Sequence, residues 1–140
     1  ATSTSTSSPP ATSSPYPTLT QLPSPTVTPT PIPEIRIDQA DLHLFLGDYE
    51  RALEEYQLAF LQASTDEVRA ASLVGMGHVQ FLMSNYQQAT DALNTVIDVY
   101  PDGFHIPKAY FYLAQSNELS GSLSDAVEYY EKLLQVIMQS

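Results

Sequence analysis

The chain has 140 residues, no cysteine and a formal net charge of −11 at pH 7, because 16 acidic side chains oppose 5 basic ones. The lack of cysteine excludes a disulfide framework and thiol chemistry. The basic residues are scattered and no run of 18 apolar residues exists, so neither nucleic acid binding nor membrane insertion is expected.

Residues 1–33 form a Pro/Thr/Ser-rich tail, with 16 Ser or Thr residues, 9 of the 11 prolines and no charged side chain. Proline fixes φ and removes a backbone donor, so this composition predicts an extended, polyproline-II-like segment. One interpretation of the tail is a flexible stalk. The other is a segment that is ordered by packing and carries sugars, since Ser/Thr with Pro is a mucin-like composition.

Covalent glycans on this chain would be O-linked, because no Asn-x-Ser/Thr sequon occurs. The candidate acceptors are the threonines of the tail: Thr2, Thr4, Thr6, Thr12, Thr18, Thr20, Thr26, Thr28 and Thr30. The second half of the tail, residues 16–33, also carries apolar side chains such as Leu19 and Val27, which suit a groove on another subunit.

From residue 34 onward, apolar side chains recur at helical spacing. Helices are predicted over residues 34–46, 49–63, 67–83, 86–99, 106–119 and 123–138. The links between these helices are short, so neighbouring helices should be antiparallel. We expect one domain over residues 34–140, made of three hairpins at about 34–66, 67–103 and 104–140.

The three hairpins are related by a period of 37 residues. Small residues recur at this interval in both helices of each hairpin: Ala40, Gly77 and Ala114, and Ala52, Ala89 and Ala126. A small side chain lets paired helices approach closely. Gly47 and Gly121 stand where a helix must end, because glycine tolerates the left-handed C-cap conformation. A fixed period in this range predicts a stacked repeat protein.

Three stretches resemble the tetratricopeptide repeat family: Gly-Asp-Tyr-x-x-Ala-x-x-x-Tyr-x-x-Ala at 47–59, a looser copy at 84–96, and Gly-x-x-x-x-Ala-x-x-x-Tyr at 121–130. Residues 100–114 look like the form common in extracytoplasmic bacterial proteins. The resemblance covers residues 34–140 and implies an all-α fold, an α-solenoid of three hairpins and six helices. The chain departs from the family in lacking tryptophan and in exceeding its period of about 34 residues.

Both ends of the predicted stack carry apolar side chains on more than one side. The residues expected on these stacking faces are Ile35, Leu42 and Phe45 in the first helix and Leu134, Ile137 and Met138 in the last. Repeat arrays usually close with a polar capping helix, and none follows here. Head-to-tail contact between copies would build a filament. The alternatives are a tail folded over one end, or a longer native chain that continues the array.

The resemblance also implies a peptide groove lined by the first helix of each hairpin. The side chains that it places there are Ile37, Asp41, Leu44, Val74, His78, Phe81, Phe111, Gln115 and Glu118. This set is apolar and acidic, and Lys108 is the one cation near it. An uncharged extended peptide, such as residues 16–33 of another copy, is therefore the expected ligand.

No motif for catalysis, cofactor binding or metal binding is present. The histidines His43, His78 and His105 have no metal-ligand spacing to one another or to carboxylates. No glycine-rich phosphate loop, nucleophile elbow or Ca²⁺ loop occurs. We therefore expect a chain that is not an enzyme and that uses no cofactor.

These features together favour a non-catalytic extracellular or cell-surface subunit that assembles head to tail, with its tail packed on neighbouring copies. A start at Ala1 fits removal of a secretory signal. Two alternatives stay open. One is a surface or periplasmic adaptor that binds a peptide in its groove and uses the tail as a stalk. The other is an accessory region of an envelope enzyme such as a lytic transglycosylase.

Overall fold

A computed structural model describes residues 2–5, 7–8, 10, 15 and 17–140. Over these residues the chain forms six helices and no strand: α1 (Pro33–Phe45), α2 (Tyr49–Gln62), α3 (Asp66–Leu82), α4 (Tyr86–Val99), α5 (Ile106–Ser120) and α6 (Leu123–Gln139). Each helix begins and ends within one residue of the bounds predicted from the sequence. The prediction of an all-α chain of three hairpins is therefore confirmed.

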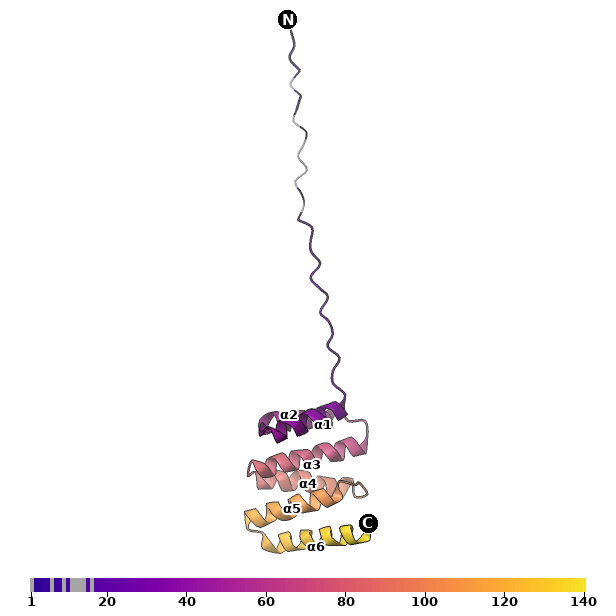
Figure 1. The fold of residues 1–140 in the computed structure, drawn as a ribbon, viewed down its shortest axis with the longest axis vertical. Coiled ribbons are helices and arrows are strands. Elements are labelled where there is room, and N and C mark those ends of the chain that lie inside the picture. The colour runs from indigo at the N-terminus through magenta and orange to yellow at the C-terminus, as the bar shows by residue number, and fades with distance from the viewer. Residues whose placement is uncertain (1, 6, 9, 11–14, 16) are drawn as a thin grey trace.

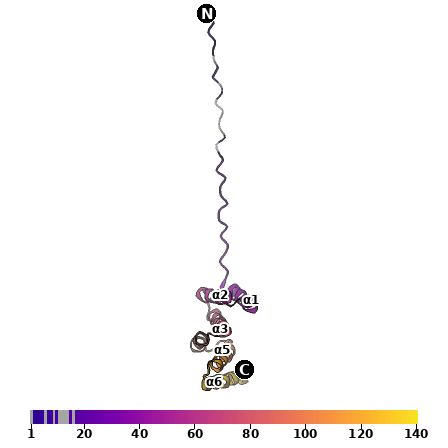
Figure 2. The ribbon, with the colours of Figure 1, turned by 90° about the vertical axis from the view of Figure 1, so that its left-hand side faces the viewer.

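The helices stack as antiparallel pairs into a solenoid (Figure 1). Each helix contacts the next one along the chain, and α3 also contacts α1 and α5. Figure 2 shows the pairs lying one above the other. The N-termini of α1, α3 and α5 therefore share one edge of the solenoid, on the right in Figure 1, which we call the N-terminal edge. Among the described helices, none has the length and apolar composition needed to cross a membrane.

One kind of turn joins the two helices of all three hairpins. Gly47, Ser84 and Gly121 occupy it with φ of 79°, 63° and 89°. In the first turn the Asp48 N–H donates to the carbonyl of His43, five residues earlier, at 2.8 Å, and the other two turns repeat this bond. Glycine adopts positive φ without a Cβ clash, so the predicted helix ends at Gly47 and Gly121 are confirmed.

Small residues set the distance between the helices. The recurring alanines are almost completely buried: Ala40, Ala52, Ala89, Ala114 and Ala126. A Cβ added to Gly77 would lie 2.5 Å from the Cγ of Leu93, and one added to Gly75 would lie 2.3 Å from the ring of Tyr56. Leu93 and Tyr56 are themselves buried, so each fills the space that the missing Cβ leaves.

The tail leaves the N-terminus of α1 and has no regular hydrogen-bonded structure over residues 17–32 (Figure 1). Ile32 has φ −67° and ψ 154°, which are polyproline II values. Leu19, Leu22 and Val27 are each at least 86% exposed, so their side chains do not pack on the repeats. The threonines predicted as glycan acceptors are exposed at 2, 4, 18, 20, 26, 28 and 30, whereas Thr6 and Thr12 lie outside the described residues.

Gly75→Ala is expected to lower the free energy of unfolding by about 1–3 kcal/mol, because the new methyl group overlaps the buried ring of Tyr56. At an uncrowded helix position the same change stabilises by about 0.5–1 kcal/mol, so the sign of the effect is informative. Urea denaturation followed by circular dichroism measures it. In a Tyr56→Leu background the loss should shrink, and an equal loss in both backgrounds would contradict the clash.

Candidate interaction surfaces

Exposed apolar side chains gather on the two terminal helices. We call Ile35, Leu42, Phe45 and Leu46 the α1 stripe and Leu123, Val127, Leu134, Ile137 and Met138 the α6 stripe. Every one of these side chains is at least 46% exposed. Their spacing of three, four or seven residues places each set along one side of its helix. All six residues expected on stacking faces from the sequence belong to these two stripes.

The 37-residue period shows which internal positions the α1 stripe corresponds to. Leu42 is equivalent to Val79 in α3 and Ser116 in α5, both completely buried, whereas Leu42 is 56% exposed. Val79 and Ser116 lie in helices that follow α2 and α4 and pack against them. Over the described residues no helix precedes α1. Ile35 has the same relation to Ser72 and Ala109, which are also buried, so Ile35 and Leu42 lie on the face that the second helix of a preceding hairpin would cover. Phe45 does not, because its equivalents Leu82 and Leu119 are exposed.

Two side chains of the α6 stripe correspond to internal side chains that face the following hairpin. Leu134 is equivalent to Ile97 in α4 and Ile137 to Tyr100, which directly follows α4. Both of these internal side chains pack against the core cluster that α5 helps to form. Leu134 and Ile137 are both more than half exposed. The α6 stripe is thus the face that the first helix of a following hairpin would cover.

A pocket of about 390 Å³ lies on the face formed by α1, α3 and α5, and we call it the groove pocket. It is lined by Asp41, Leu44, Phe45, Tyr56, Gly75, His78, Leu82 and Lys108. Of the side chains that the family resemblance placed in a groove, Asp41, Leu44 and His78 meet there. The others on these helices lie outside the pocket: Ile37, Phe81, Phe111, Gln115 and Glu118.

Val74 corrects the expected groove set. This side chain is 2% exposed and belongs to the core cluster with Leu93 and Leu113, because this side of α3 faces the neighbouring helices. Tyr56, by contrast, was not expected in the groove but lines the pocket. Its ring comes from α2 and reaches the groove pocket across Gly75, whose missing Cβ was the one signal in the sequence for this approach.

Polar contacts hold the groove pocket in one arrangement. The Tyr56 hydroxyl donates a hydrogen bond to Asp41, and burial together with this carboxylate raises the pKa of Tyr56. The imidazole of His78 stacks on the ring of Tyr112 at 4.2 Å between centroids. Burial and the charge of Lys108 lower the pKa of His78 below its usual value of 6.5, while Asp41 opposes them. His78 is therefore neutral at pH 7.

A second pocket, of about 440 Å³, opens at the N-terminal edge between the start of α3 and the α4–α5 loop, and we call it the edge pocket. It is lined by Asp66, Glu67, Ala70, Val99, Tyr100, Pro101, Asp102, Gly103, Phe104 and His105. The sequence analysis did not predict it, because residues 66–70 and 99–105 meet only after α3 and α4 pair. The aromatic residues of the α4–α5 loop were the available signal.

The edge pocket combines an aromatic wall with carboxylate acceptors. Phe104 is 72% exposed, and its ring centroid lies 4.0 Å from that of His105. The Nε2 atom of His105 is buried and has no hydrogen-bond partner among the described residues. Burial lowers the pKa of His105, with Glu67 opposing, so the imidazole is neutral at pH 7. The pocket can therefore accept hydrogen bonds and pack against apolar rings.

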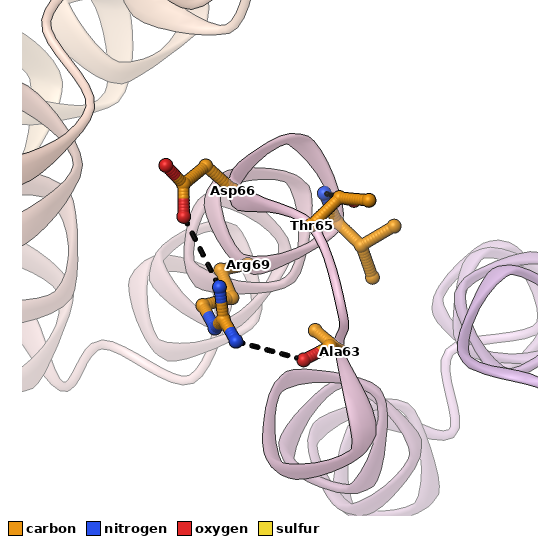
Figure 3. Close-up of polar contacts among 5 residues, drawn as sticks. Ala63, Thr65, Asp66 and Arg69 are labelled. Atoms are coloured by element: carbon orange, nitrogen blue, oxygen red, sulfur yellow. Dashed lines mark hydrogen bonds and ion pairs between the residues drawn. The ribbon is translucent and has the colours of Figure 1, made fainter.

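Arg69 fixes the wall of the edge pocket that α3 provides (Figure 3). Its guanidinium donates to the carbonyl of Ala63 at 2.9 Å and to the carboxylate of Asp66 at 3.1 Å. The Thr65 hydroxyl accepts from the Val68 N–H at 3.3 Å and caps α3. These bonds tie the α2–α3 link to the first turn of α3, which holds Asp66 and Glu67 in place. Within the described part of the chain, no His, Asp or Glu group is arranged to hold a metal ion.

Comparison with known proteins identifies the repeats. Residues 33–64 and residues 74–137 each match a family described as tetratricopeptide repeat. The two matches together include parts of all six helices. No curated protein is similar in sequence to the chain.

Tyr56→Phe is expected to lower the free energy of unfolding by about 1–2 kcal/mol, because it removes the only described hydrogen bond to the Asp41 side chain. Burial and Asp41 hold the pKa of Tyr56 above its ordinary value of 10, so the unfolded chain ionises first as pH rises. The contribution of Tyr56 to stability is therefore complete below pH 10 and declines above it. Urea denaturation at neutral pH and above pH 10 should show a shallower alkaline decline in Tyr56→Phe.

Tyr130→Phe is the matched control for this hydroxyl. Tyr130 also donates to a carboxylate, Glu118, at 2.9 Å, but this pair is exposed on the surface. Its loss should cost less than about 0.5 kcal/mol. Equal effects of the two substitutions would show that burial of the Tyr56–Asp41 pair contributes nothing.

Proposed function

Because the chain belongs to the tetratricopeptide repeat family, whose repeats serve protein–protein interaction, we propose that its partner is a second copy of itself. In this proposal the α6 stripe of one copy covers the α1 stripe of the next. The contact joins two different surfaces, so each copy keeps one free face and growth continues. The product is a filament in which hairpins follow one another across successive chains.

The observation that carries this proposal is the equivalence of Ile35 and Leu42 to buried internal side chains, and of Leu134 and Ile137 to half-buried ones. Inside the chain, α2 packs on α3 and α4 on α5. Each of these contacts joins the second helix of one hairpin to the first helix of the next. Placing α6 of one copy on α1 of another repeats this contact and removes two apolar stripes from water, at about 25 cal/mol for each Å² buried.

The contact between copies differs in detail from the internal ones. Leu42 stands where the internal helices have Val79 and Ser116, so the α1 stripe is bulkier. Asp38 stands where Gly75 receives the ring of Tyr56. Tyr130, the equivalent of Tyr56, cannot enter α1 of another copy in the same way. The helices at this contact should therefore lie further apart than within a chain, and the net charge of −11 makes assembly stronger at higher salt.

The tail adds a second link in this proposal. It carries no charge, so the acidic surface of a neighbouring copy does not repel it. Its extended backbone and exposed Leu19, Leu22 and Val27 support packing against another subunit. We place the filament outside the cell and the sugars on the exposed threonines of the tail, which their Pro/Ser/Thr setting favours.

The groove pocket supports a second candidate function, an adaptor that binds an extended peptide. Asp41, neutral His78 and Lys108 surround an apolar floor there, which suits a peptide with few charges. A pure monomer at high concentration that binds such a peptide would favour this function over self-assembly.

Two single substitutions test the head-to-tail contact. Leu42→Glu blocks the α1 stripe and Ile137→Glu blocks the α6 stripe, and both positions are more than half exposed, so folding is spared. Each variant alone should remain monomeric in analytical ultracentrifugation, whereas the unsubstituted chain forms filaments. The reason is that burying the new carboxylate without a charged partner is unfavourable. An equal mixture of the two variants should give 1:1 dimers, because the α6 stripe of Leu42→Glu and the α1 stripe of Ile137→Glu are both intact.

Leu61→Glu is the control for added charge, since Leu61 is 77% exposed on α2 and belongs to neither stripe. It should leave assembly unchanged. The proposal fails if the unsubstituted chain is monomeric by negative-stain microscopy at high salt, or if the mixture yields no dimer.

Mass spectrometry of the chain from its native source tests glycosylation. The polypeptide alone has a mass of 15.4 kDa. We expect a value that exceeds 15.4 kDa by whole sugar units. β-Elimination removes each O-linked sugar together with the acceptor oxygen, so it should bring the mass below that of the unmodified chain by one water for each sugar chain released. Peptide mapping should place the sugars within residues 1–33. An unmodified mass removes the glycan from the proposal and leaves the stacking contact untouched.

A further inference from the structure

We infer that the edge pocket binds the tail of a neighbouring copy, through the Pro/Thr segment around Val27. This inference rests on the proposed head-to-tail assembly and names the site at which the second link between copies forms. The occupant is specified by three features of the structure: the chemistry of the pocket, the charge of the tail, and the edge from which the tail leaves.

The lining of the edge pocket matches a proline- and threonine-rich segment. Tyr100 and Phe104 provide aromatic surfaces, against which polyproline II segments dock. Glu67 and Asp102 provide acceptors for threonine hydroxyls. Polyproline II has three residues per turn, so Pro25, Thr28 and Pro31 share one side of the segment. That side offers rings and a hydroxyl donor together.

Charge selects the tail over the rest of the chain as the occupant. The pocket is lined by three carboxylates, Asp66, Glu67 and Asp102, of which Asp66 is paired with Arg69. Residues 34–140 carry the whole net charge of −11, whereas residues 1–33 carry none. Another part of a second copy would bring like charge to this site. The tail brings only apolar groups and hydroxyls.

Position favours the tail of a neighbour over the chain's own tail. The tail leaves α1 at the N-terminal edge, on which the edge pocket also opens, and runs away from its own repeats (Figures 1 and 2). A copy stacked on the α1 stripe brings its edge pocket alongside this path. Two helix layers, about 20 Å, separate the N-terminus of α1 from the edge pocket of the copy stacked on it. Polyproline II advances about 3.1 Å per residue, so about six residues before Pro33 reach the pocket.

Disulfide trapping tests the assignment, because the chain has no cysteine of its own. The variant Val27→Cys/Pro101→Cys places one thiol in the segment and one at the rim of the pocket, where Pro101 is exposed. Mild oxidation should give a ladder of covalent oligomers on a non-reducing gel that reducing agent abolishes. The control Val27→Cys/Glu54→Cys carries its second thiol on α2, away from the pocket, and should give less than about a tenth of that ladder.

The outcomes separate this inference from the proposed assembly. Filaments that form without crosslinking overturn the pocket assignment and leave stacking intact. A crosslinked monomer shows that the segment folds back onto its own chain, which also overturns it. Monomers without any crosslink overturn both proposals. Phe104→Ala supplies an independent readout: loss of one exposed aromatic contact should raise the concentration needed for filaments by about fivefold, while Leu61→Ala should not change it.

Discussion

Each helix of this protein is apolar on more sides than one neighbour can cover. In the interior of the array these apolar sides are covered, because every helix lies between two others and the recurring alanines and glycines let the backbones approach. Leu93 against Gly77 and Tyr56 against Gly75 show how completely the space is used. At the ends of the array no second neighbour is present among the described residues, so the α1 and α6 stripes are exposed to water. The self-association that we propose follows from this constraint.

Charge works against the same association. A net charge of −11 on each chain would keep separate copies apart in dilute salt, whereas burial of the two stripes would favour the proposed contact. The tail escapes this opposition because it has no charge. The assembly that we propose would therefore respond to ionic strength mainly through the contact between helices, because the uncharged tail is not repelled by the acidic repeats.

The two pockets differ in how the chain builds them. The groove pocket joins side chains from α1, α2, α3 and α5, and the Tyr56–Asp41 hydrogen bond and neutral His78 give it a polar rim. The edge pocket occurs where the second hairpin meets the third, at a loop with Tyr100, Phe104 and His105. Arg69 makes the opposite wall rigid. A site at this junction suits the second link between subunits that we propose.

The sequence by itself determined the all-α fold, the six helix bounds to within one residue and the turns at Gly47 and Gly121. These features depend on local spacing, on glycine at positive φ and on helical periodicity, all of which act within a few residues. Only the tertiary structure decided that Val74 is buried, that Tyr56 reaches the groove pocket and that the edge pocket exists. Those outcomes depend on how closely and at what rotation separate helices pack, and the spacing of residues along one helix does not contain that information.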